Sequence, residues 1–412
     1  MAVEAAADRI EHRVGAPIAD ETAAVFDALN HPVGTPPLRD IVRPGERVAV
    51  IVNDITRLTR TDLLLPPVIE TLNRAGIPDS GIFIVFALGI HRPQTGAERR
   101  KIIGDALFRR IRNFDHICTD EENLTTVGTT RFGNVVQINR QVMEADRIVL
   151  TGEIMYHLIA GYSGGRKSLV PGVAGFRTTT FNHRMIFQPR AAAGILDGNP
   201  AHEDLLEACR MIGPDFLVNV VLTPDGSLAH VAAGHYEQAH RAGCRVVDEL
   251  LSAPLDRTYD VLVASAGGFP LDIDLRQAHK GLENACRALK PGGAILFFAQ
   301  CPNGSGHPAF DAYVARYGND EEMKRALLDH FEVGGHKAYW VAKLGREFDI
   351  HLVSDLPEEF VRRCHLKPVH PERHAEALNE LIQTAGPSAR IGVIPHAGHT
   401  LPRVAAPQEV TA

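Results

Sequence analysis

The stretch ERVAVIVNDITRLTRTDLLLPPVIETLNRAGIPDSGIFIVFALG, residues 46–89, decides the fold class of this chain. It holds a short valine-rich apolar run at 46–54, a segment with helical spacing at 61–77 and a second apolar run at 81–89. Near-continuous apolar runs are typical of strands that are buried on both faces of a parallel sheet. The stretch therefore predicts a β-α-β unit, and its crossover should be right-handed.

The same alternation of strands and helices continues along the rest of the chain. It predicts a helix at 97–111, a buried strand at 145–154, a hairpin around Thr-Pro-Asp-Gly at 215–234 and another helix at 235–254. A second series follows. It predicts a helix at 276–293, which should end at a Pro-Gly-Gly sequence, and strands at 257–268, 294–301, 348–354 and 389–395. Such alternation predicts an α/β protein of two domains with mainly parallel sheets.

The break between the two series defines the expected domains. We expect an N-terminal α/β domain at 1–255, which would bind the cofactor and carry the catalytic residues, and a Rossmann-like α/β domain at 256–395. A C-terminal segment, 396–412, remains, and its return to the N-terminal domain is left open. Ligands of open α/β sheets lie beyond the carboxyl ends of the strands, so functional residues are sought there.

Composition limits the classes of protein to which the chain can belong. Its 412 residues suffice for two or three domains of ~150 residues each. The net charge of −7 and the lack of long basic runs argue against a nucleic-acid partner. Neither a signal peptide nor a membrane span is expected, since no apolar window of about 18 uncharged residues occurs. Six cysteines without a CxxC pair suit a reducing cytoplasm.

The loop GYSGGRKSLVPG, residues 161–172, approaches a phosphate-binding P-loop but departs from it in two ways. A P-loop needs G-x-x-x-x-G-K-[ST] between a strand and a helix. Lys167 and Ser168 fit, but Arg166 occupies the place of the second glycine, and Pro171 interrupts the expected helix. Nucleotide hydrolysis is therefore not favoured. A loop that cradles an anion and a tight turn with a solvated Arg-Lys pair both stay open.

Several polar residues follow the predicted strands. Asp54 and Arg57 come just after the first strand, His91 follows the strand at 81–89, and His157 follows the strand at 145–154. An arginine in this place can bind a carboxylate through two hydrogen bonds. The alternatives are ordinary: Asp54 as a helix cap, and each histidine as one of twenty surface or core residues. No two of His91, His157 and His183 have the H-x-x-x-H spacing of a zinc site.

Taken together, these segments resemble the nickel-pincer lactate racemases and their relatives, which are 2-hydroxyacid racemases and epimerases. The resemblance covers roughly residues 40–300 and rests on NDITR (53–57), GIHRPQT (89–95), E-x-x-x-H (153–157), GYSGGRKSLVPG (161–172), NH (182–183), GNPAHED (198–204) and RQAHKG (276–281). Any one of these motifs is weak. The glycine-rich loop combined with the downstream Asn-His is specific.

The resemblance implies a cofactor. In this family a lysine of the glycine-rich loop, here Lys167, carries pyridinium-3,5-bisthiocarboxylic acid mononucleotide, the nickel-pincer nucleotide, as a thioamide. Gly164 and Gly165 would accommodate it and Asp54 would steady its surroundings. Two sulfurs and a ring carbon of the cofactor, together with His183, would hold the nickel. Soft sulfur donors and imidazole suit Ni(II), and a cofactor that supplies most ligands leaves no protein cluster to find.

The resemblance also implies the chemistry. His91 and His157 would act as the catalytic bases, one for the hydroxyl proton of each enantiomer. The α-hydrogen would leave as hydride, a planar 2-keto acid would form, and hydride would return to the opposite face. Arg57 would orient the substrate, and Gln277 and Lys280 of the second domain would contact it. The active site would then lie in the cleft between the domains, and closure could exclude water.

Arg276 departs from the pattern of lactate-specific members, which carry tyrosine at this place. An added cation beside the substrate's side chain indicates a substrate larger or more polar than lactate. The alternative is that Arg276 faces solvent. The chain is thus expected to be a cytoplasmic enzyme whose partners are a small 2-hydroxy acid and the proteins that make its cofactor, with its oligomeric state open.

Two other functions stay open. An NAD-dependent 2-hydroxyacid oxidoreductase should carry G-x-G-x-x-G after a strand, with an acid about 20 residues later. The nearest candidate, ASAGGFPLDID at 264–274, lacks that pattern. A non-catalytic binding relative that keeps the fold is the other alternative. The presence of His91, His157 and Lys167 argues against it.

Overall fold

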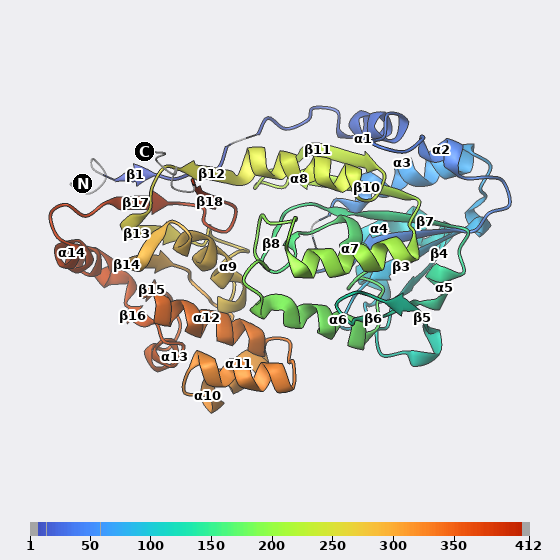
Figure 1. The fold of residues 1–412 in the computed structure, drawn as a ribbon. Coiled ribbons are helices and arrows are strands. Elements are labelled where there is room, and N and C mark those ends of the chain that lie inside the picture. The colour runs from blue at the N-terminus through green and yellow to red at the C-terminus, as the bar shows by residue number, and fades with distance from the viewer. Residues whose placement is uncertain (1–6, 14, 58, 406–412) are drawn as a thin grey trace, which may run out of the picture. The chain divides into compact units, whose positions relative to one another are not determined.

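A computed structural model describes residues 7–13, 15–57 and 59–405 (Figure 1). The chain forms two compact units. One is Val14–Leu250, and the other combines Met1–Arg13 with Leu251–Ala412. The first described residues thus group with the C-terminal unit, and so does the described part of the segment 396–412. Two strand pairings account for this: β1 (Asp8–Arg9) joins β17 (Ile391–Ile394), and β12 (Ser252–Leu255) joins β18 (Leu401–Val404).

The N-terminal unit is built on a six-stranded sheet. Its order is β11-β10-β7-β2-β3-β4, with the strands at Leu228–Gly234, Phe216–Leu222, Arg147–Glu153, Val48–Asn53, Ile82–Ala87 and Arg112–Asp115. All neighbours are parallel except β10 and β11, which form the expected hairpin. Its turn closes with a hydrogen bond from Thr223 N–H to the carbonyl of Ser227 at 2.9 Å. The predicted β-α-β unit at 46–89 is confirmed as β2, α3 (Thr61–Arg74) and β3.

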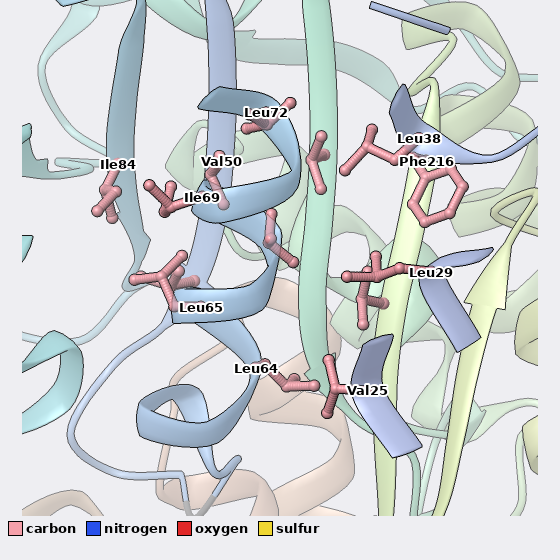
Figure 2. Close-up of a cluster of buried hydrophobic side chains, with 14 of the residues drawn as sticks. Val25, Leu29, Leu38, Val50, Leu64, Leu65, Ile69, Leu72, Ile84 and Phe216 are labelled. Carbon is pink, nitrogen blue, oxygen red and sulfur yellow. The ribbon is translucent and has the colours of Figure 1, made fainter. Parts of the chain in front are cut away.

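Helices cover this sheet, and the apolar positions of α3 explain why it packs there. Leu64, Leu65, Ile69 and Leu72 of α3 are fully or almost fully buried. Among them, Leu65 and Ile69 lie toward Val50 and Ile84 of the sheet (Figure 2). Burial of each such side chain contributes about 1.5–3 kcal/mol. The other helices of the unit are α1 (Glu21–Asn30), α2 (Leu38–Ile41), α4 (Gly96–Arg110), α5 (Arg140–Met143), α6 (Phe176–His183), α7 (Pro200–Ile212) and α8 (Gln238–Leu251).

Two small hairpins and short 3₁₀ turns complete the N-terminal unit. The hairpins pair β5 (Leu124–Thr129) with β6 (Val135–Asn139), and β8 (Tyr156–His157) with β9 (Gly161–Tyr162). The 3₁₀ turns are η1 (Asp79–Gly81), η2 (Glu121–Asn123), η3 (Gly165–Ser168) and η4 (Arg184–Phe187). The hairpin β8–β9 and the turn η3 follow β7 directly and carry the residues of the glycine-rich loop.

The C-terminal unit has its own six-stranded sheet, which is parallel throughout. Its order is β1-β17-β13-β14-β15-β16, with β13–β16 at Tyr259–Ser265, Leu289–Phe298, Asp349–Val353 and Lys367–Val369. The helices are α9 (Leu275–Cys286), α10 (Pro308–Arg316), α11 (Asp320–Asp329), α12 (Gly335–Glu347), α13 (Glu358–Arg363) and α14 (His374–Ala385), with η5 at Pro371–Arg373. The prediction of an α/β fold with mainly parallel sheets is confirmed.

One expected boundary in this unit is wrong. The helix predicted at 276–293 ends at Cys286, because Leu289 already pairs with Tyr259 as the first residue of β14. The Pro-Gly-Gly sequence lies inside that strand, where the register between β13 and β14 shifts. Such an irregularity tolerates proline, which cannot donate to the strand ladder.

Two further properties bear on the class of protein. All six cysteines are buried and none forms a disulfide. Of the helices in the described parts of the chain, none has the length and apolar character that crossing a bilayer requires.

Candidate functional site

The carboxyl ends of β2, β3 and β7 bring three predicted site segments to one edge of the N-terminal sheet. The strands are parallel neighbours, so their carboxyl ends share that edge. Asp54 follows β2, His91 follows β3, and Glu153 is the last residue of β7. This is the edge at which ligands of α/β sheets bind.

Asp54 and His91 form a close pair at this edge. Nδ1 of His91 donates to Oδ2 of Asp54 at 2.6 Å, and the hydroxyl of Thr56 donates to Oδ1 of Asp54 at 2.7 Å. Burial works to raise the pKa of Asp54, but the hydrogen bond from His91, and the charge of that ring when it is protonated, outweigh burial, so this pKa is lowered. An ionised Asp54 keeps the proton of neutral His91 on Nδ1 and leaves the lone pair on Nε2, as a general base requires. The sequence had assigned Asp54 to the cofactor's surroundings and had not paired it with His91.

Backbone hydrogen bonds connect the loop of His91 to the glycine-rich loop. Gly89 N–H donates to the carbonyl of Gly172 at 2.9 Å, and Gly172 N–H donates to the carbonyl of Lys167 at 3.1 Å. A Cβ on Gly172 would lie 2.1 Å from the carbonyl oxygen of Ser168, so a side chain cannot be placed there. The connection positions the segments of His91 and Lys167 relative to each other.

Lys167 lies in η3, and its side chain is mostly buried. Burial first, and then the charges of Arg166 and Arg57, lower the pKa of the Lys167 amine to about 7. A large fraction of this amine is therefore neutral near pH 7, and a neutral amine is nucleophilic. Within the described residues the amine has no hydrogen-bond partner, so nothing in them competes with a reaction at nitrogen.

The structure explains why residues 164 and 165 are glycines, which the sequence did not reveal. Both have positive φ, +69° and +56°. A Cβ on Gly164 would lie 2.6 Å from Oδ1 of Asn219, and one on Gly165 would lie 2.7 Å from the ring of His240. Asn219 also accepts the N–H of Gly165 at 2.7 Å. These glycines let the loop approach β10 and α8, and their expected contact with the cofactor stays a prediction.

Arg166 is buried and is therefore not available as a surface ligand for an anion. It is 1% exposed, and its Nη2 donates to the carbonyls of Ala160 at 2.7 Å and Tyr162 at 3.2 Å. Its Nη1 lies 3.0 Å from Nε2 of His240. Burial, followed by the charge of Arg166, lowers the pKa of His240 to about 3, so that ring is neutral. Arg166 thus stabilises the glycine-rich loop by hydrogen bonds to backbone carbonyls, at the position where a P-loop has glycine.

His157 ends β8, the first strand of a short hairpin. Its Nδ1 accepts the N–H groups of Ile159 at 3.2 Å and Ala160 at 3.1 Å. This ring nitrogen is therefore an acceptor, and the proton of neutral His157 sits on Nε2. The arrangement is opposite to that of His91.

His183 is the last residue of α6, and a backbone carbonyl orients its ring. Its Nδ1 donates to the carbonyl of Thr179 at 2.7 Å, which leaves the lone pair on Nε2. The preceding Asn182 is buried and donates to Oδ2 of Asp204 at 2.8 Å. Asp204 also accepts from Thr130 and Asn134, so α6 is firmly attached to α7. In the described chain no group of three or more His, Cys, Asp or Glu side chains is arranged around a metal position.

Glu153 is a largely buried carboxyl group to which sequence reasoning assigned no role. Burial raises the pKa of Glu153 to about 7, although the charge of Arg57 counteracts the shift. Arg57 itself is exposed. Glu153 opens the motif E-x-x-x-H at the end of a buried strand, but the motif assigned it no role, and its pKa depends on burial that the sequence does not display.

In the C-terminal unit, the first turn of α9 brings the predicted substrate residues together. Lys280 donates to Oε1 of Gln277 at 2.7 Å, and Asp274 caps the helix by accepting the N–H of Gln277 at 2.7 Å. Arg276 lies 3.8 Å from Asp274, and its side chain is 37% exposed, so solvent reaches only part of it. The expectation that these residues and those of the N-terminal unit share one cleft stays a prediction.

Two further residues near the start of α9, His279 and Lys337, were not identified from the sequence. His279 is completely buried, donates from Nδ1 to the carbonyl of Arg276 at 2.5 Å and accepts from Nζ of Lys337 at 3.2 Å. A second ammonium group therefore lies close to α9. Lys337 is far from α9 in sequence, and no motif pointed to it.

Comparison with known proteins agrees with the resemblance that the sequence suggested. The lactate racemase N-terminal domain family matches residues 2–194, and the lactate racemase C-terminal domain family matches residues 256–399. The lactate racemase of Lactiplantibacillus plantarum is 31% identical over 382 residues, which cover 91% of this chain and 89% of that protein. The lactate racemase of Thermoanaerobacterium thermosaccharolyticum is 29% identical over 382 residues, which again cover 91% of this chain and 89% of that protein.

Solved structures agree as well. The lactate racemase apoprotein of T. thermosaccharolyticum has a TM-score of 0.87 at 29% identity and covers 97% of this chain and 94% of its own. A Thermotoga maritima protein, with a TM-score of 0.68 at 20% identity, covers 95% of this chain and 100% of its own and shows the fold alone. These relatives are racemases, and racemases are isomerases, so the expected class of enzyme, an isomerase, is confirmed. The chain belongs to the lactate racemase family.

Proposed function

We propose that this protein is a nickel-dependent racemase or epimerase of a 2-hydroxy acid. The α-hydrogen would leave and return as hydride through a planar 2-keto acid. The observation that carries the proposal is the amine of Lys167, which is mostly buried, has a pKa of about 7 and stands in a loop held by its glycines and by Arg166. A neutral amine in a fixed loop suits covalent attachment of a cofactor, whereas a phosphate-binding lysine must be charged.

The residues of the site fit the nickel-pincer nucleotide. Lys167 offers a nucleophilic nitrogen for the thioamide, and His183 offers an Nε2 lone pair for a metal. When bound, that group supplies a hydride acceptor and most of the ligands of the nickel ion. The lack of a protein-only metal cluster in the described residues is compatible with such a cofactor.

The chain's own residues would bind the substrate and move its hydroxyl proton. His91, oriented by Asp54, would accept that proton at Nε2 from one enantiomer. His157 would serve the other enantiomer. Arg57, and Gln277 and Lys280 of α9, would bind the carboxylate.

A chiral assay tests this function directly. Protein loaded with the cofactor should convert each of two single enantiomers toward the racemic mixture without added NAD. Chiral chromatography would measure the product. Accumulation of a 2-keto acid that depends on NAD would instead identify an oxidoreductase, and no turnover of any 2-hydroxy acid would favour a binding protein.

Replacing His183 with alanine should lower nickel retention by roughly tenfold or more, because outer contacts of metal ligands alone are worth 10–100-fold. The His91→Ala and His157→Ala variants should keep their nickel, since neither residue is expected to be a ligand. Metal analysis of the loaded and desalted proteins makes the comparison. Equal nickel content in all three variants would remove His183 as the protein ligand.

The substrate should be more polar than lactate. The guanidinium of Arg276, which lies 3.8 Å from Asp274, can also bind a second carboxylate or several hydroxyls, and the methyl group of lactate cannot make these contacts. A hydrogen bond to a charged group contributes about 1.5–3 kcal/mol, or roughly ten- to hundredfold in selectivity. We therefore expect malate-like or sugar-acid substrates to be turned over faster than lactate.

A panel of single-enantiomer 2-hydroxy acids, assayed with wild type, Arg276→Tyr and the exposed control Arg325→Tyr, measures this preference. The first variant should shift the preference toward lactate, and the control should not. If lactate is the best substrate of wild type and Arg276→Tyr changes little, Arg276 does not contact the substrate.

A further inference from the structure

The motif GNPAHED, residues 198–204, contains an asparagine whose hydrogen bonds are all accounted for. Asn199 is completely buried at the N-cap of α7. Its Oδ1 accepts the N–H groups of Ala201 at 3.0 Å and His202 at 3.2 Å. Its Nδ2 donates to the carbonyls of Ile195 at 3.0 Å and Ile159 at 2.9 Å. These four partners fix the orientation of the amide, because N–H groups can face only its oxygen and carbonyls only its nitrogen.

One of these carbonyls belongs to the peptide group that holds His157. The carbonyl of Ile159 and the N–H of Ala160 form a single peptide unit, and that N–H donates to Nδ1 of His157 at 3.1 Å. In a planar trans peptide the two groups point in opposite directions. Asn199, the peptide and His157 therefore form one hydrogen-bonded chain, in which each bond polarises the next.

The two flanking peptide groups add to this arrangement. The N–H of Ile159, in the preceding peptide, also donates to Nδ1 of His157 at 3.2 Å, and the carbonyl of Ala160, in the following peptide, accepts from buried Arg166 at 2.7 Å. The Ile159–Ala160 peptide is thus attached to Asn199 and the next peptide to Arg166, which keeps the N–H of Ala160 directed at the imidazole ring. A proton on Nδ1 of His157 would face both N–H groups.

We propose that Asn199 is a positioning residue that acts through the Ile159–Ala160 peptide to keep Nδ1 of His157 an acceptor, with the ring proton on Nε2. His91 has the opposite tautomer, because Asp54 accepts its Nδ1 proton. The consequence for catalysis rests on the proposed function. The resting site offers one lone pair and one N–H rather than two equal bases, so Nε2 of His157 can accept a proton only after it has given up the one that it holds.

Nitrogen-15 NMR of the full-length protein tests this assignment without the cofactor. In wild type, Nδ1 of His157 should have a pyridine-type shift and Nε2 a pyrrole-type shift, and the His157→Asn variant identifies the signals. A scalar coupling across the hydrogen bond from Ala160 N to Nδ1 should be visible. A pyrrole-type Nδ1, or no such coupling, would overturn the proposal.

Asn199→Asp tests the role of the asparagine itself. Aspartate caps a helix as well as asparagine does, but it cannot donate to the carbonyl of Ile159. The ratio of the two tautomers should move roughly fivefold toward the Nδ1–H form, the factor that one hydrogen bond provides. Asn199→Ser, which keeps a capping hydroxyl, should behave alike. The matched cap variant Asn319→Asp on α11 should leave His157 unchanged.

These outcomes separate the inference from the proposed function. Unchanged His157 signals in folded Asn199 variants would overturn the positioning role. If neither variant folds, the wild-type shifts and the coupling still decide the matter. A protein with the expected tautomer but without racemase activity would contradict the function and leave the inference standing.

Discussion

Replacement of Lys167 with alanine should abolish both the covalent adduct and turnover while leaving the fold intact. The loss should approach the whole enzymatic acceleration, at least about 10⁶-fold, because the cofactor carries the difficult chemistry and its attachment point is gone. Lys167→Arg should fail as well, since a guanidinium cannot form the thioamide. Intact-protein mass and a chiral assay measure the two effects, with the exposed Lys101→Ala on α4 as control. Full activity in Lys167→Ala would end the covalent hypothesis.

The pKa of about 7 at Lys167 adds a measurable property of the protein before cofactor loading. Its folded-state pKa is depressed by burial and by Arg166 and Arg57, so the amine is protonated below pH 7 and becomes reactive as the pH rises through 7. Brief acetylation across a pH series, followed by peptide mass spectrometry, would give this midpoint. A midpoint near the ordinary lysine value of ~10.4 would show that the amine is not desolvated.

Replacement of His91 or His157 with alanine should each lower turnover by about 10²–10⁴-fold in both directions. A complete racemisation cycle needs a group for the hydroxyl proton of each enantiomer, so removal of either histidine blocks both directions. Rates measured separately from each enantiomer check this, with His330→Ala, an exposed position after α11, as control. Loss in only one direction would contradict the expectation of two linked groups.

The fate of the α-hydrogen distinguishes two ways in which these histidines could act. If it leaves as hydride, an α-deuterated substrate should keep its label in the product. If a histidine removes it as a proton, the label should exchange with solvent. Mass spectrometry of the product separates the outcomes, and extensive exchange would rule out the hydride mechanism.

Much of the fold could be predicted because the relevant information is local. The apolar runs at 46–54 and 81–89 became β2 and β3 within two residues at each end, since a strand buried on both faces leaves its mark on consecutive residues. The helix at 276–293 was extended too far because its final Leu-Lys-Pro-Gly-Gly has no local sign of pairing with β13. The strands β1, β12 and β18 were missed because they are short and pair with distant segments.

By itself, the sequence determined the α/β class, the family and the placing of Asp54, His91 and Lys167 at strand ends or in a glycine-rich loop, because strand periodicity and motif spacing are properties of neighbouring residues. Only the tertiary structure decided the partners: Asp54 with His91, 37 positions away, Arg166 with the loop's own carbonyls, and Asn199 with the peptide beside His157. Hydrogen bonds depend on direction and distance in space, and burial sets the pKa of Lys167. Neither can be read from the order of residues, because the elements that supply the partners are far apart along the chain.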